Sequence, residues 1–278
     1  RLAPRLMDRR HFSLVPSIHQ TISGRKRFYK LVDVVPMADG DQIGFGITLD
    51  GKTLRTPARN PLILPNLPLA VSIAAEWDAQ TDTRNGIQPV NMPMMGLACT
   101  AIDQVQIEPE IVINTCVRYL PTDAALFITT AADRVLLGQQ QQHFLPVVDW
   151  LNAQLGINLA PTESMAGRIS HPEETIMKVT ALLRKMDAFS LTALQGATLE
   201  SKSLVLSLAY IARIIDLEQM VAASRLEEEF QVEIWGVVEG GHDMDRLNNA
   251  VRISSVGAFM SMYHTPSEAK DRWAAWTS

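Results

Sequence analysis

The hydrophobic pattern of the chain changes near residue 130, and this change limits the folds that the chain can adopt. From Phe28 to Leu64 the residues favour strands, as in "RFYKLVDVV" and "IGFGITLD". After Ile128 such stretches almost vanish, and apolar residues recur at helical spacing. The pattern predicts an α+β protein, in which an N-terminal β-rich domain (a small antiparallel sheet with helices) precedes a C-terminal helical bundle domain.

Turn and helix signals divide the first half. Asp50-Gly51 lies where a tight hairpin turn needs residues with positive φ. Apolar residues at helical spacing predict a helix that begins after Pro68, in "LPLAVSIAAEWDAQ". The stretches "LACTAIDQV" and "PEIVINTCVRYL" predict two more helices.

In the second half, proline, glycine and aspartate mark where helices are expected to begin and end. The helix in "RVLLGQQQQHFLPVVDWLNAQLG" should be kinked or restarted by Pro146 and should end at Gly156. Another helix should open at His171-Pro172-Glu173-Glu174, and the long helical stretch that follows should divide near Ala197 to Glu200 and near Asp216. The expected limits are 24–130 for the β-rich domain, 131–265 for the helical domain and 266–278 for a C-terminal tail.

The first thirty residues contain eight Arg or Lys and one acid, Asp8, with Ser, Thr and Leu between them. Organelle transit peptides have this composition, so residues 1–23 are interpreted as a transit peptide, with a nucleic-acid-binding arm as the alternative. Without residues 1–22 the chain carries 21 basic and 29 acidic side chains, a net charge of −8. We expect such an acidic protein to bind no nucleic acid. Its apolar runs are too short for membrane insertion.

Sequence motifs of enzymes and metal sites are absent. No phosphate-binding loop, nucleophile elbow or HExxH zinc pair occurs, and Cys99 and Cys116 fit no metal or disulfide pattern. Only His242 has close acidic neighbours, Asp243 and Asp245, whereas a metal needs three or four donors. We therefore expect no catalytic residue, no cofactor, no metal and no small-molecule substrate.

The segment "RLEEEFQVEIWGVVEGGHD" (225–243) crowds acidic residues around one tryptophan. On a helical wheel, six apolar residues project to one side and form a stripe that is expected to be buried: Met220, Ala223, Leu226, Phe230, Ile234 and Val237. Glu228 projects nearly opposite this stripe, close to Trp235. Glu227 projects within the stripe, where an unpaired buried carboxylate is costly.

Three interpretations of this segment remain open. Glu227 could form a salt bridge to an Arg of a neighbouring helix. It could instead belong to a partner-binding surface, for which the candidates are Glu227, Glu228, Gln231 and Trp235. The third interpretation is a hydrolase or metal-dependent enzyme that uses the acidic region from Glu227 to Asp245.

Several ordered motifs together resemble one known family. They are "GRKRFYK" (24–30), "LDGKTLRTPARNPLILP" (49–65), "LAVSIAAEWDAQ" (69–80), "NMPMMGLACTAID" (91–103) and "SRLEEEFQVEIWGVVEGGHD" (224–243). From Gly24 to about Met262 the chain resembles the mitochondrial assembly chaperones for the alpha subunit of the catalytic head of ATP synthase.

The resemblance implies a two-domain, non-enzymatic chaperone of the mitochondrial matrix. Such a chaperone holds the unassembled ATP synthase alpha subunit until the beta subunit replaces it. The resemblance also implies a functionally sensitive glutamate in the C-terminal helical region. It does not choose among Glu227, Glu228 and Glu229, and the helical wheel favours Glu227. The chain departs from the family pattern at residues 143–146, where "HFLP" stands in place of Trp-Asp-Pro.

Overall fold

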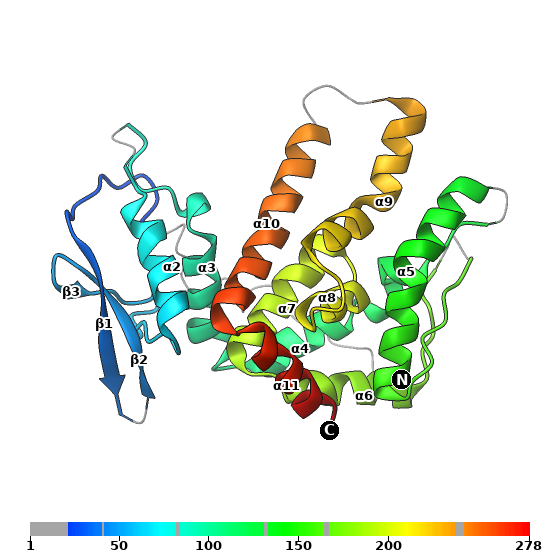
Figure 1. The fold of residues 1–278 in the computed structure, drawn as a ribbon, viewed down its shortest axis with the longest axis horizontal. Coiled ribbons are helices and arrows are strands. Elements are labelled where there is room, and N and C mark those ends of the chain that lie inside the picture. The colour runs from blue at the N-terminus through cyan, green and yellow to red at the C-terminus, as the bar shows by residue number, and fades with distance from the viewer. Residues whose placement is uncertain (1–21, 41, 82–83, 131–132, 164–166, 237–241) are drawn as a thin grey trace, which may run out of the picture. The chain divides into compact units, whose positions relative to one another are not determined.

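The computed structural model describes residues 22–278 except 41, 82–83, 131–132, 164–166 and 237–241. Contacts divide the chain into two compact units, Arg1–Ile107 and Glu108–Ser278. The first contains a small antiparallel sheet with helices, and the described part of the second is mostly helical (Figure 1). The predicted α+β class is confirmed.

The sheet of the first unit has three antiparallel strands in the order β1-β2-β3: Val32–Asp39, Gln42–Leu49 and Lys52–Thr53. The turn between β2 and β3 contains Asp50 and Gly51, with φ values of 49° and 78°. These positive values confirm the predicted hairpin, because glycine and aspartate adopt this conformation more readily than most residues.

Strand β1 lies at an edge of the described sheet, and its Pro36 is opposite Phe45 of β2. Phe45 exchanges two backbone hydrogen bonds of 2.8 Å with Leu64, which lies on the other side of β2. Phe45 therefore directs its N–H and C=O away from β1. As a result, Pro36 and Phe45 form a non-hydrogen-bonded pair.

Helices complete the first unit: α2 (Leu67–Asp78), η2 (Pro89–Asn91), α3 (Pro93–Thr100) and η3 (Ala101–Val105). The helix predicted after Pro68 is α2, which begins two residues earlier, at Leu67, because the side chain of Asn66 accepts a hydrogen bond from the Leu69 N–H. In α2, Glu76 is buried and accepts hydrogen bonds from the first N–H groups of α3, those of Met94 and Met95.

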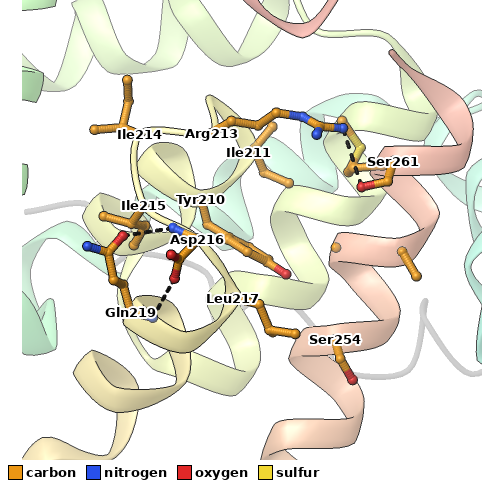
Figure 2. Close-up of a pocket in the computed structure, with 13 residues that line it drawn as sticks. Tyr210, Ile211, Arg213, Ile214, Ile215, Asp216, Leu217, Gln219, Ser254 and Ser261 are labelled. Atoms are coloured by element: carbon orange, nitrogen blue, oxygen red, sulfur yellow. Dashed lines mark hydrogen bonds between the residues drawn. The ribbon is translucent and has the colours of Figure 1, made fainter. Parts of the chain in front are cut away.

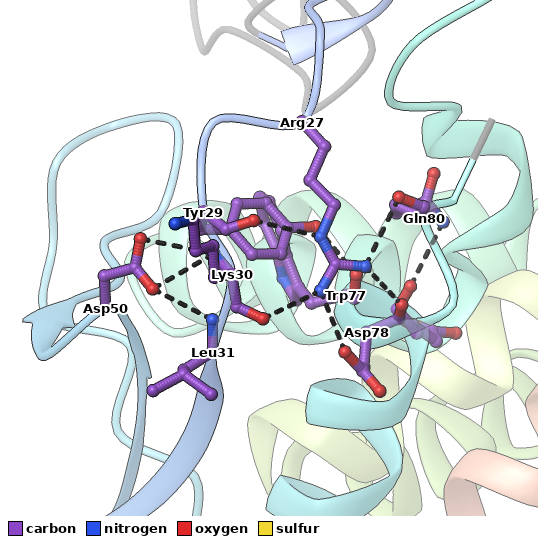
Figure 3. A network of polar contacts seen from close by, with 9 residues as sticks. Arg27, Tyr29, Lys30, Leu31, Asp50, Trp77, Asp78 and Gln80 are labelled. Atoms are coloured by element: carbon purple, nitrogen blue, oxygen red, sulfur yellow. Dashed lines mark hydrogen bonds and ion pairs between the residues drawn. The ribbon is translucent and has the colours of Figure 1, made fainter. Parts of the chain in front are cut away.

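Three of the motifs that carry the family resemblance meet in one polar network (Figure 3). Arg27 donates hydrogen bonds to the backbone oxygens of Tyr29 and Asp78 and pairs with the Asp78 carboxylate at 2.9 Å. The Tyr29 hydroxyl donates to the Trp77 carbonyl at 2.7 Å. Asp50 accepts from the N–H groups that follow Tyr29. These residues thus tie the chain before β1 to α2 and to the hairpin.

The second unit is built from helices α4 (Pro109–Val117), α5 (Arg134–Leu155), α6 (Glu173–Arg184), α7 (Ala188–Ser201), α8 (Leu204–Ile211), α9 (Leu217–Trp235), α10 (His242–Tyr263) and α11 (Pro266–Thr277), with short turns η4 (Leu120–Thr122) and η5 (Ala124–Leu126). Every residue of α8 is buried, so α8 is the central helix of this unit. The predicted divisions between α7, α8 and α9 are confirmed within a few residues.

A single buried carboxylate anchors the start of α8. Asp123 is fully buried and accepts hydrogen bonds from the N–H groups of Ala125, Leu204 and Val205, at 3.1, 2.7 and 3.0 Å. Burial raises the pKa of Asp123 to about 6, while these hydrogen bonds oppose the rise. The carboxylate satisfies backbone donors that the first turn of a helix leaves unpaired.

The structure differs from the sequence expectations at three places. The contact boundary follows Ile107, so the expected limit at residue 130 lies inside the second unit. Helix α4 packs on α6 and α7, and this tertiary contact has no signal in the local sequence. Helix α5 continues through Pro146, so the helix does not restart there, and it ends before Gly156 as expected. The expected tail forms α11, where Trp273 and Trp276 are buried. Residues 1–21, most of the predicted transit peptide, lie outside the described residues.

Candidate functional site

Helix α9 contains the acidic segment and lies between α5 and α10 (Figure 1). Asp216 and Gln219 form a capping box at its start. Its first half is anchored by Met220 and Leu226, which are buried. Its second half becomes progressively exposed toward Trp235. The acidic residues are thus located where α9 leaves the core.

Glu227 is oriented by a buried glutamine of α5. The Oε1 of Glu227 accepts a hydrogen bond of 2.8 Å from the Nε2 of Gln140. Gln140 is only 1 % exposed, and its Oε1 accepts a hydrogen bond of 2.7 Å from the Thr129 N–H. Because this second bond fixes the orientation of the amide, Nε2 must face Glu227. The other oxygen of Glu227 has no hydrogen-bond partner among the described residues.

The charge of Glu227 is poorly compensated. Loss of contact with water raises the pKa of its carboxyl group, which the hydrogen bond from Gln140 only partly opposes, and the charge of Glu228 raises it further. Within the described residues no Arg or Lys forms an ion pair with Glu227. The salt bridge to an Arg of a neighbouring helix is therefore not found at Glu227 in the part of the chain that the structure describes.

The neighbouring glutamates are paired instead. Arg225 is buried and contacts both Glu228, at 3.0 Å, and Glu229, at 3.1 Å. Arg246 of α10 also pairs with Glu229, and its hydrogen bond is the main reason why the pKa of Glu229 is lowered. Glu228 and Glu229 thus have ion-pair partners, whereas Glu227, which is exposed, has none among the described residues and gains only the nearby charge of Lys202.

The end of α9 exposes apolar side chains. Ile234 is 54 % exposed and Trp235 is 77 % exposed. The expected burial of the apolar stripe was therefore wrong at Ile234, Phe230 is only half-buried, and Val237 lies outside the described residues. Val135 at the start of α5 and Met244 at the start of α10 are exposed as well. Three helix ends thus carry large exposed apolar side chains.

The sequence candidates fall into two groups on α9. Glu227, Gln231 and Trp235 are spaced by four residues and therefore form one row along the helix. Glu228 lies outside this row and is held by Arg225. We call the set Glu227, Gln231, Ile234 and Trp235 the α9 surface.

Gln140 was missed by sequence analysis, because it stands in the run Gln139–Gln142, which is too short to be informative by composition. A signal was nevertheless present. Gln140 continues the helical spacing of the buried residues of α5: Phe144, Val147, Val148 and Leu151. A polar residue at a core position of a helix is expected to have a specific hydrogen-bond partner.

No group of three His, Cys, Asp or Glu side chains that could hold a metal occurs among the described residues. The side chains of His242 and Asp243, two of the three suspected ligands, lie outside this description. In the part of the chain that the structure describes, no helix has the length and apolarity needed to cross a membrane.

Comparison with known proteins identifies relatives along most of the chain. The family model described as "ATP12 chaperone protein" matches residues 26–152. Protein atp12, mitochondrial, of Schizosaccharomyces pombe is 28 % identical over 221 residues, which cover 76 % of this chain and 75 % of that protein. Protein ATP12, mitochondrial, of Saccharomyces cerevisiae is 25 % identical over 258 residues, which cover 77 % and 78 %.

A solved structure extends this similarity to the fold. The crystal structure of Atp12 from Paracoccus denitrificans superposes with a TM-score of 0.76 and 30 % sequence identity. The match covers 86 % of this chain and 98 % of that chain. The similarity therefore includes both the sheet-containing unit and the helical unit.

Proposed function

The chain belongs to the ATP12 chaperone family, and on this premise we propose that it binds the unassembled alpha subunit of ATP synthase in the mitochondrial matrix and promotes assembly of the catalytic head. Membership of the family supports a role as an assembly chaperone for ATP synthase. The names of both yeast relatives place those proteins in mitochondria. The alpha subunit as the client, and the matrix as the compartment, are the finer parts of the proposal.

The physical requirement for such a chaperone is a surface that covers the client until assembly. A subunit of a ring exposes apolar surface before its neighbours arrive, and exposed apolar patches aggregate. A chaperone that covers this surface needs exposed apolar anchors of its own, together with polar groups that fix the orientation of binding. It needs no catalytic group.

The α9 surface meets this requirement, and the state of Glu227 is the observation that carries the proposal. Gln140 holds one oxygen of its carboxylate, and the other oxygen has no partner among the described residues. Ile234 and Trp235 expose apolar area further along the same helix. A carboxylate that is oriented but uncompensated is suited to accept a hydrogen bond or a positive charge from a partner.

Capture of the alpha subunit by purified variants tests this function. Immobilised wild-type protein should retain alpha subunit from a mitochondrial extract. Glu227→Gln, which removes the charge, should weaken this capture about tenfold, and Glu227→Lys should weaken it more. Glu233→Gln is the matched control, because Glu233 is an exposed glutamate on another side of α9 without an ion pair among the described residues. Equal capture by Glu227→Lys and Glu233→Gln would exclude Glu227 from the client surface.

The compartment is tested separately. Residues 1–40 fused to a fluorescent protein should direct it to mitochondria, because the basic, hydroxylated composition of residues 1–23 is typical of transit peptides. Protease treatment of isolated mitochondria, with and without rupture of the inner membrane, then distinguishes the matrix from other compartments. A cytosolic or nuclear signal contradicts the proposed location.

A further inference from the structure

A glutamine occupies a core position of α5 beside the α9 surface. Gln140 is almost completely buried and shares the buried face of α5 with Phe144 and Val147. Burial of an amide costs free energy unless its donors and acceptor find hydrogen-bond partners, and an apolar side chain would fill the same position without this cost. The partners of Gln140 therefore indicate what its amide does.

The oxygen of the Gln140 amide is held by a segment that is itself fixed. It accepts a hydrogen bond of 2.7 Å from the N–H of Thr129. The chain just before Thr129 pairs with Thr162: the Ile128 N–H donates to the Thr162 carbonyl at 3.0 Å, and the Thr162 N–H donates to the Leu126 carbonyl at 2.8 Å. The amide of Gln140 thus cannot turn over without losing its bond to Thr129.

The nitrogen of the same amide is directed to the α9 surface. Its Nε2 donates to the Oε1 of Glu227 at 2.8 Å, whereas the carbonyl oxygen of Phe127 is 3.5 Å away. The carboxylate of Glu227 is therefore the main acceptor, and hydrogen bonds to a charged acceptor are the stronger kind. This bond holds one oxygen of Glu227 toward α5. The side chain of Glu227 is exposed, and its second oxygen has no hydrogen-bond partner among the described residues.

The backbone of α9 is fixed independently of this bond. At the start of α9, the N–H of Asp216 donates to the Gln219 side chain at 2.9 Å, and the N–H of Gln219 donates to the Asp216 carboxylate at 2.8 Å (Figure 2). Met220 and Leu226 are buried and anchor the turns that follow. The position of the Glu227 backbone is thus set by the first half of α9, and Gln140 fixes the orientation of the side chain.

Two charged groups act on the carboxyl group of Glu227. Glu228 of α9 raises its pKa, and Lys202 at the end of α7 lowers it. Lys202 also lies 3.8 Å from the carboxylate of Glu228, so its charge is shared between the two glutamates. The hydrogen bond from Gln140 lowers the pKa of Glu227 more than Lys202 does. Gln140 is therefore the group that most favours the charged form of Glu227.

We propose that Gln140 is a positioning residue of the client-binding surface, which holds the Glu227 carboxylate so that its second oxygen can accept a hydrogen bond from a Lys or Arg side chain of the client. A group that is already oriented loses less conformational freedom when a partner binds. A basic side chain is the partner that a carboxylate binds most strongly. This inference rests on the proposed chaperone function and adds a residue of α5 to its surface.

The variant Gln140→Glu tests the direction of this hydrogen bond. Glutamate keeps the shape of the side chain and the acceptor for the Thr129 N–H, but it replaces the donor to Glu227 with a second carboxyl oxygen. Two carboxyl groups at this distance must share a proton. Capture of the alpha subunit should therefore fall about tenfold, as for Glu227→Gln. Gln141→Glu is the matched control, because Gln141 is the exposed neighbour on α5 and undergoes the same change in charge. Equal capture by Gln140→Glu and Gln141→Glu overturns the proposal.

An exchange of the two side chains separates positioning from stability. In Gln140→Glu/Glu227→Gln the hydrogen bond is kept with donor and acceptor reversed, and the net charge of the protein is unchanged. Thermal unfolding should show the exchange variant to be more stable than Gln140→Glu, because the two carboxyl groups no longer face each other. Its capture should nevertheless stay as weak as that of Glu227→Gln, since the carboxylate now lies in the core. Recovery of wild-type capture by the exchange variant overturns the proposal.

A titration tests the positioning without the client. Gln140→Met removes the donor without adding a charge, so the pKa of the Glu227 carboxyl group, measured by NMR, should rise above its wild-type value. The pH at which half of the capture is lost should rise with it. An unchanged pKa in Gln140→Met overturns the proposal. If the pKa rises but the wild-type protein captures no alpha subunit, the proposed function fails, whereas the effect of Gln140 on Glu227 stands.

Discussion

The two ends of the helical unit use the same residue types in opposite ways. At the core end, formed by α8 and residues 217–226 of α9, Asp123 is buried and accepts three backbone hydrogen bonds, and Met220 is fully buried. At the free end, formed by residues 227–235 of α9 and 242–251 of α10, Glu227 accepts one hydrogen bond and Ile234 is exposed. The apolar stripe of α9 runs through both ends without a break in sequence.

This difference shows how a stabilising residue can be distinguished from a residue available for binding. A carboxylate whose acceptor capacity is used by the fold, such as Asp123, has little left to offer a partner. Glu227 is exposed, and the described residues supply its carboxylate with one donor, Gln140. Substitutions at the core end should therefore change the free energy of unfolding, whereas substitutions at the free end should change client capture.

The largest loss in the free energy of unfolding is expected for Asp123→Ala. Three buried N–H groups lose their acceptor, each at a cost of about 1–3 kcal/mol, so the free energy of unfolding should fall by about 3–9 kcal/mol. Urea denaturation followed by circular dichroism measures this loss. Asp133→Ala is the comparison, because Asp133 caps α5 through a single hydrogen bond to the Leu136 N–H and should cost about 1 kcal/mol. Equal losses in both variants would show that Asp123 is not an anchor.

Two apolar truncations compare the buried first half of α9 with its exposed second half. Met220→Ala should lower the free energy of unfolding by about 3 kcal/mol, because the side chain is fully buried and leaves a cavity. Ile234→Ala should change it by less than about 0.5 kcal/mol, because more than half of that side chain is exposed. Alpha-subunit capture should be measured at a temperature where both variants are folded. There Ile234→Ala should cause the larger loss of capture and Met220→Ala the smaller. A large loss of stability in Ile234→Ala would contradict the view that the exposed end of α9 contributes little to the free energy of unfolding.

Arg225→Met removes the buried cation that pairs with Glu228 and Glu229. Methionine keeps much of the apolar volume, so the loss should come mainly from the two carboxylates. Both are partly exposed and Glu229 keeps Arg246, so the expected loss is about 1–2 kcal/mol, below the value for breaking a fully buried pair. A loss that disappears in 1 M salt would indicate that the pairs are ordinary surface contacts.

The smallest effect on stability is expected for Glu227→Gln, below about 1 kcal/mol, because only one hydrogen bond is altered. Its signature should be the pH dependence of capture. The raised pKa of Glu227 means that the carboxyl group gains its proton at a higher pH than an ordinary glutamate. Capture by the wild-type protein should thus weaken as the pH falls through a range above 4.5, the usual value, while Glu227→Gln shows no such change. Parallel pH curves for the two proteins would contradict a role of this charge.

The sequence predicted which residues of α9 share a face, but not which of them are covered. Periodicity placed Met220, Leu226 and Ile234 on one stripe because the geometry of a helix is local. Whether another element packs against a given turn depends on the tertiary fold. In α9 the neighbouring helices cover Met220 and Leu226 and leave Ile234 open. The expectation of burial failed at Ile234 and held only in part at Phe230, which is half-buried, for that reason.

The hydrogen-bond partners of the charged residues could not be predicted from the sequence either. The unusual position of Glu227 was evident from the wheel, yet its partner Gln140 lies 87 residues away along the chain. Asp123 drew no attention, because an aspartate in a loop carries no sign that helix α8 begins against it. By contrast, the hairpin at Asp50 and Gly51 was predicted correctly, since positive φ values are a local requirement.

Pro36 of the edge strand has a consequence for how this protein can associate with other chains. Because Phe45 turns its polar groups toward Leu64, the backbone nitrogen of Pro36 points to the outer edge of β1, where another strand would need an N–H donor. Proline lacks that donor, and so the middle of the edge offers no continuous ladder. The middle of this edge is thereby closed to a further strand, which protects the protein from pairing with another chain through β1.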